Sequence, residues 1–154
     1  MVIRVDIQHK PGRLTMLARG KSAESGVAEV YIHGAANVAK AGYLEELGHD
    51  PLGVPQEVKR MAREMAKVGV RSLDPEKSKR TLTAAAQYTA KWLRERITTG
   101  GLGRLAQSTF WRKIHLIRIG RASSKYGIPG PYGFLTGKLV QSIKARWRPG
   151  NARG

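Results

Sequence analysis

The chain has 154 residues, of which 41% are hydrophobic and 6% aromatic, and its 28 Lys and Arg against 11 Asp and Glu give a net charge of +17. This length is enough for one domain that buries its own core, and the absence of Cys excludes disulfides and thiolate metal sites. Charged residues near the N-terminus and the lack of a run of roughly 20 apolar residues predict a soluble protein without a signal peptide or a membrane span.

The N-terminal third predicts two strands and a helix. Alternating apolar residues indicate strands at 2–7 and 27–33, while 13–26 carries no decisive pattern. Residues 35–47 are rich in Ala and Leu and predict a helix. Gly48 is expected to end it, because glycine adopts the left-handed backbone of a helix C-terminus at no steric cost.

The central part of the chain predicts three helices. Apolar residues at three- and four-residue spacing indicate the first helix, at 57–68. The second covers 75–98, with Asp74 as its N-cap and a proline at its first position. The third covers 105–119, although the apolar run at 114–119 is also compatible with a strand.

The C-terminal part begins with a segment rich in Gly and Pro, at 120–134, which predicts a loop. Thr136 is then expected to cap a short helical turn over 137–141. Residues 142–148 alternate apolar and polar side chains, which predicts a half-buried strand. A flexible basic tail is expected at 149–154.

These elements predict an α+β fold. Its sheet is small and mainly antiparallel and includes 2–7, 27–33 and 142–148. Several helices pack on it, and the long helix over 75–98 is the centre of the fold. We expect a single domain over 1–148.

No pattern in the sequence indicates catalysis, a cofactor or a metal. Glu45 and Glu46 are adjacent, so on a helix they point about 100° apart and cannot form a facing acid–base pair. Gly100–Gly103 follows a helix and not a strand, and is better interpreted as a helix stop than as a phosphate-binding loop. The four histidines lack metal-ligand spacing. The sequence therefore predicts a protein that is not an enzyme.

The distribution of charge is the most informative global property. All 11 acidic residues lie at or before Glu95, while the segment from Arg96 to Gly154 holds 12 Lys and Arg. Such a one-signed region attracts nucleic acid or an acidic protein, although solubility alone is the alternative explanation. Aromatic residues that can stack on bases lie among these cations, although Trp111 at helical spacing is more often a core residue. The candidate contacts to DNA or to a protein partner are Arg112, Lys113, Arg118, Arg121, Lys144, Arg146 and Arg148.

Two short patterns, about ninety residues apart, resemble places where a helix or strand begins or ends and the backbone conformation is tightly constrained. The first is a helix end followed by a proline-rich loop, with the residues Tyr43, Glu46, Gly48 and Pro55. The second is a Thr-Gly-x-Leu-x-x-Ser-Ile segment, with the residues Thr136, Gly137, Leu139, Ser142 and Ile143.

In this order and spacing, the patterns resemble those of bacteriophage neck or tail-completion proteins, the minor structural proteins that join head and tail in long-tailed phages. The chain departs from the family pattern at Leu47, where Phe is usual, at His49, where Thr is usual, and at Leu135, where Asp is usual. The resemblance extends from about residue 27 to 148.

The resemblance implies a non-catalytic virion subunit, assembled in the host cytoplasm into a ring of six or twelve copies. Its partners would be the connector or head-closure protein, the tail tube or terminator, and packaged DNA. It implies no cofactor, small-molecule substrate or membrane. We expect most of the motif residues to shape the fold and fewer of them to contact partners. The alternative is a free-standing DNA- or RNA-binding protein; a basic ribonuclease would need an acid–base set that the sequence lacks.

Overall fold

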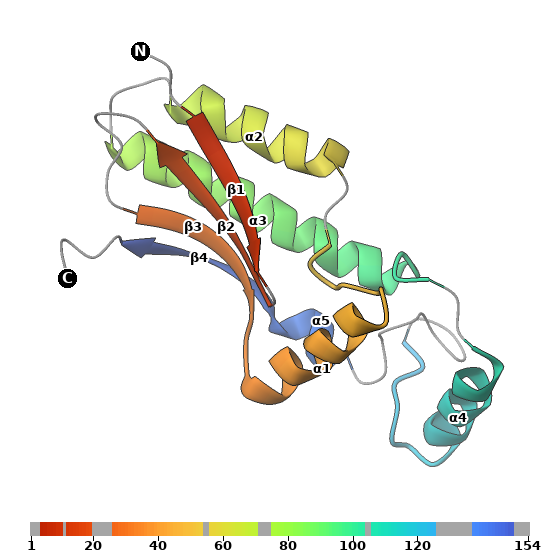
Figure 1. Ribbon diagram of the computed structural model, residues 1–154. Helices are drawn as coiled ribbons and strands as arrows, with labels where there is room; N and C mark the ends of the chain where they lie inside the picture. Colours follow the sequence, from red (N-terminus) through yellow and green to blue (C-terminus); the bar gives the residue numbers. More distant parts are fainter. Residues whose placement is uncertain are drawn as a thin grey trace. The chain divides into compact units, whose positions relative to one another are not determined.

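The structure is a computed structural model that describes residues 4–10, 12–19, 26–53, 56–70, 75–103, 106–125 and 137–149 (Figure 1). Its strands are β1 (Arg4–Lys10), β2 (Arg13–Arg19), β3 (Gly26–Ile32) and β4 (Ile143–Pro149). They form one antiparallel sheet in the order β1-β2-β3-β4. The predicted α+β fold with a mainly antiparallel sheet is confirmed.

The helices in the described part of the chain are α1 (Ala35–Glu46), α2 (Gln56–Val70), α3 (Pro75–Thr98), α4 (Gln107–Arg118) and α5 (Lys138–Ser142). The long helix α3 has the predicted bounds. The alternative of a strand at 114–119 is wrong, because α4 continues through Arg118 and its C-cap is Ile119. The predicted N-cap Asp74 and most of the predicted loop at 120–134 lie outside the described residues.

The chain divides into two compact units, each of which is described by itself. The first contains Met1–Tyr31, Val54–Lys91 and Lys144–Gly154, and the second contains Ile32–Gly53 and Trp92–Ile143. The strands β3 and β4 and the helix α3 each contribute residues to both units. The single domain expected over 1–148 stays a prediction.

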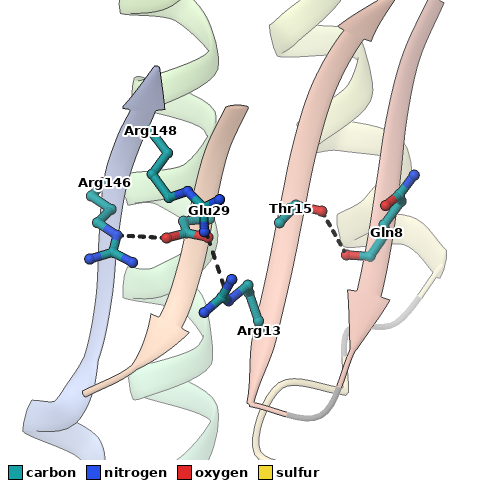
Figure 2. A network of polar contacts seen from close by, with 6 residues as sticks. All are labelled: Gln8, Arg13, Thr15, Glu29, Arg146 and Arg148. Carbon is teal, nitrogen blue, oxygen red and sulfur yellow. Dashed lines mark hydrogen bonds and ion pairs between the residues drawn. The ribbon is translucent and has the colours of Figure 1, made fainter. Parts of the chain in front are cut away.

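In the first unit, α2 and α3 cover one face of the sheet (Figures 1 and 2). Strand alternation turns the apolar residues of β2 and β3 toward this face, where Leu14, Met16, Ala28 and Val30 are fully buried. The covering helices contribute small and apolar side chains at helical spacing, namely Val58, Ala62, Ala66, Leu82, Ala85 and Ala86. Small residues let the helices approach the sheet closely. The opposite face, which no helix in the described part of the chain covers, carries polar side chains such as those of Thr15, Glu29 and Arg146 (Figure 2).

In the second unit, glycines end each of the longer helices. α1, α3 and α4 are followed at the second position by Gly48, Gly100 and Gly120, all with positive φ. The backbone N–H that follows each glycine donates to a carbonyl five residues earlier, as His49 does to Leu44 at 2.8 Å. This is the Schellman motif, which satisfies carbonyls left without a partner at a helix end. The predicted role of Gly48 is therefore observed.

The sequence interpretation missed β2. Its residues 13–19 form an antiparallel hairpin with β1, in which Lys10 pairs with Arg13. The alternation of Leu14 and Met16 with polar residues is short, and Leu17 and Ala18 interrupt it, which hid the strand. Pairing with β2 also extends β1 to Lys10, beyond the predicted end at residue 7.

The predicted cap of the short C-terminal helix is displaced by one residue. α5 begins at Lys138, and Gly137 occupies the N-cap position with a left-handed backbone of φ 80°. Thr136 lies outside the described residues. A glycine takes the cap position because a side chain there would strain this backbone conformation.

Candidate functional site

A buried carboxylate lies at the centre of the uncovered face of the sheet, in the first unit. Glu29 on β3 is 0% exposed, and three arginines from the neighbouring strands surround it (Figure 2). Arg13 comes from β2, and Arg146 and Arg148 come from β4. Three cations around one anion leave the cluster with an excess of two positive charges, which faces solvent.

Arg146 is the most firmly held of the three. Its Nε donates a hydrogen bond of 2.6 Å to Glu29 Oε1, and its guanidinium lies 4.2 Å from the centre of the Tyr31 ring. The hydrogen bond to Glu29 raises the pKa of Arg146 above its usual range, so this side chain stays charged. A charge-assisted bond and a cation–π contact together fix its orientation.

Arg13 and Arg148 are held more loosely. Their nearest nitrogens lie 3.6 Å and 4.0 Å from Glu29 Oε2, which are ion-pair distances and too long for hydrogen bonds. Oε2 is buried and has no hydrogen-bond donor among the described residues. The side chains of Arg13 and Arg148 are 45% and 52% exposed, so their guanidinium groups are accessible to a ligand.

A half-open pocket of about 210 Å³ lies between these side chains. It is lined by Gln8, Lys10, Arg13, Thr15, Val27, Glu29 and Arg148. Apart from Val27, the lining consists of cations, the carboxylate, an amide and a hydroxyl. This lining suits an anionic group, and the fork of N–H donors on a guanidinium matches the oxygens of a phosphate or a carboxylate particularly well.

The sheet register explains how distant parts of the sequence build this site. Thr15 is paired with Glu29, and Arg13 with Tyr31, so residues of β2 and β3 alternate onto the same face. Arg146 and Arg148 are two residues apart on β4, and Lys144 shares their side of the strand by the same alternation. Sequence reasoning named Lys144, Arg146 and Arg148, but it missed Arg13 and Glu29, because it did not show which strands lie beside β3.

The other predicted contacts belong to the second unit. Arg112, Arg118 and Arg121 are exposed on or just after α4, as expected for partner contacts. Lys113 is only 6% exposed, so its ammonium is not displayed on the surface of this chain. Burial, with a smaller contribution from nearby Lys40, lowers the pKa of Lys113 to about 8.

The aromatic residues among these cations also differ from expectation. Trp111 is 60% exposed and not a core residue. Its ring meets that of Phe110 edge to face, with 5.3 Å between centroids. In the first unit, the Trp147 ring lies over Gly26, where an added Cβ would come within 2.0 Å of it. Of Trp111 and Trp147, Trp111 is therefore better placed for contact with a partner.

The helices that carry the two sequence patterns are in contact in the second unit. α1, which ends at the first pattern, contacts α5, which belongs to the second. The backbone N–H of His33, just before α1, donates to the carbonyl of Ser142 at 2.8 Å. The buried motif residues are Gly137, Leu139, Ser142 and Ile143, whereas Tyr43, Glu46 and Gly48 are exposed. Pro55 and Thr136 lie outside the described residues.

Within the described ranges, no group of three or more His, Cys, Asp and Glu could hold a metal ion. No helix there combines the length and the apolar character needed to cross a membrane. Comparison with known protein families, with curated proteins and with solved structures finds no match.

Proposed function

We propose that this chain is a non-catalytic structural subunit of a bacteriophage neck or tail end, which joins the head connector to the tail as part of a ring. The observation that carries the proposal is that α1, which ends in the first family-like pattern, contacts α5, which belongs to the second pattern about ninety residues later. This long-range contact supports the interpretation of both patterns as parts of one structural unit.

Exposed apolar side chains in the same unit support an assembly role. Tyr43 is 61% exposed and Leu47 is 48% exposed, both at the end of α1. Trp111 and Ile119 on and after α4 are similarly exposed. Large apolar side chains at a surface are typical of protein–protein contacts, and a closed ring buries such residues in head-to-tail interfaces.

The test is the oligomeric state of the purified chain, measured by light scattering after size exclusion at high salt and by electron microscopy. We expect closed rings of six or twelve copies. A Tyr43→Ser variant should lose the rings while it keeps its circular dichroism spectrum. Tyr88→Ser, at a tyrosine of α3 that is 37% exposed, is the matched control and should still assemble. A chain that stays monomeric under all these conditions contradicts self-assembly into a ring.

The alternative function, a free-standing nucleic-acid-binding protein, is favoured by the arginine cluster around Glu29. It predicts a monomer or dimer that binds DNA or RNA tightly in solution. The same measurements separate the two functions, because a ring and a monomer differ at least sixfold in mass.

A further inference from the structure

We propose that the uncovered face of the sheet binds the phosphate backbone of duplex DNA, with Arg13 and Arg148 as the phosphate ligands and Glu29 as the residue that positions them. This inference goes beyond the ring proposal and does not depend on it, since a site in one chain can bind DNA whether or not the chain forms rings.

The first step is the number and placement of the cations. Among the side chains that the structure describes, five basic ones belong to this face, on three of its four strands: Lys10, Arg13, Lys144, Arg146 and Arg148. All five are exposed, whereas Glu29 is completely buried beneath them. Adjacent strands are about 4.8 Å apart and the cations come from both outer strands, β1 and β4, so they extend beyond the point where the three arginines meet Glu29. A ligand that neutralises them must itself carry a series of anions.

The second step is the freedom of the two phosphate ligands. Arg146 is fixed by its short bond to Glu29 and by the Tyr31 ring. Arg13 and Arg148 are only attracted to Oε2, at 3.6 Å and 4.0 Å, and both line the pocket. The carboxylate therefore holds the two guanidiniums beside the pocket by charge attraction and accepts no hydrogen bond from either of them. An incoming phosphate can accept from both.

The third step is the choice of ligand. Duplex DNA carries one negative charge per roughly 1.7 Å of helix axis, so it presents a dense and regular series of anions to an extended basic surface. The pocket of about 210 Å³ also offers Thr15 and Gln8 beside the cations, and hydroxyl and amide groups are frequent partners of phosphate oxygens. Such contacts with the backbone need no base-reading motif, and they predict binding that is independent of sequence.

The experiment measures binding of the full-length chain to a fluorescent duplex of about 24 base pairs by anisotropy, over a series of salt concentrations. We expect Arg13→Gln/Arg148→Gln to weaken binding roughly tenfold or more and to reduce the slope of log K against log salt by about 1.8, because each lost phosphate contact contributes about 0.9. The matched control is Arg60→Gln/Arg80→Gln, which removes the same charge from exposed positions on α2 and α3 of the same unit. It should leave the slope nearly unchanged.

The Arg13/Arg148 double variant leaves the buried Glu29 with Arg146 as its one remaining arginine, so it could lose DNA binding because it unfolds. A second double variant separates these two causes. Lys10→Gln/Lys144→Gln leaves all three arginines in place and should weaken binding on the same face. Equal affinity and salt slope in the arginine variant and its control would overturn the proposal, as would wild-type protein that does not bind DNA in 50 mM salt. Displacement of the labelled DNA by poly-glutamate as effectively as by unlabelled DNA, at equal charge, would assign the face to an acidic protein instead.

Discussion

The two basic regions of this molecule come from the same acid-free stretch of sequence, yet they are built differently. On β4, Arg146 and Arg148 are gathered around Glu29, an acid that lies more than a hundred residues earlier in the chain. On α4, Arg112 and Arg118 have no ion-pair partner in the described part of the chain. Lys113, which lies between them in the sequence, is buried. The two segments carry similar positive charge in the sequence. The arginines of β4 form an organised surface around Glu29, whereas α4 places one of its cations, Lys113, in a buried position.

The physical difference lies in what each region does with its charge. Around Glu29, the burial of a carboxylate is compensated by one hydrogen bond and two ion pairs. At Lys113, burial acts against the charged form, and Lys40 adds to the same effect. The first region is therefore suited to hold arginines ready for a ligand, whereas the second carries a cation that the fold disfavours.

The largest effect should come from removing the fixed arginine. Arg146→Met leaves Glu29 buried without its hydrogen bond, and we expect a loss of roughly 2–3 kcal/mol in the free energy of unfolding, measured by urea denaturation. Arg112→Met on α4 is the control and should change stability by less than about 0.5 kcal/mol. Adding Glu29→Gln to Arg146→Met should restore part of the loss. Similar small changes in both single variants would refute the distinction between the regions.

A smaller effect should appear in the dependence of stability on pH. The pKa of Lys113 is lowered to about 8 in the folded chain from the usual 10.5. Between these values the unfolded chain binds one proton more than the folded chain, so stability rises with pH across this window. We expect the advantage of wild type over Lys113→Met to grow by roughly 1–2 kcal/mol from pH 8 to 10.5. A difference between the two proteins that stays constant over this range would show that Lys113 titrates normally.

The smallest effects should come from the helix α1, where two glycines have opposite roles. Gly48 has φ 78°, so Gly48→Ala should cost about 1 kcal/mol in thermal or urea unfolding. Gly42 lies inside the helix with nothing within 4 Å of an added Cβ. Gly42→Ala should therefore stabilise the chain by roughly 0.5–1 kcal/mol. If both substitutions changed stability in the same direction, the assignment of Gly48 as a helix terminus would be wrong.

Much of the fold was predictable because its signals are local. The bounds of α3 follow from Pro75 at the start and from the run Thr98-Thr99-Gly100-Gly101 at the end. Gly48 predicts the end of α1, and alternation predicts β3 and β4. β2 was missed because only Leu14 and Met16 keep the strand period clearly, and the short helix begins one residue later than predicted because Gly137 holds the cap.

The candidate site was predictable only in part. Lys144, Arg146 and Arg148 were named from charge alone, and their exposure agrees with that choice. Lys113 was chosen on the same ground, but helix α4 buries it, since charge counts do not reveal which face of a helix is covered. Arg13 and Glu29 carried no local signal, because their roles depend on which strands become neighbours.

The sequence by itself determined the α+β class, the long helix α3, the glycine-ended helices and the concentration of positive charge toward the C-terminus. These properties depend on residues close together in the chain, where backbone preference and periodicity act directly. Only the tertiary structure decided that Glu29 lies among Arg13, Arg146 and Arg148, and that α1 meets α5. Such pairings arise from strand register and long-range packing, which bring together side chains that no local pattern connects.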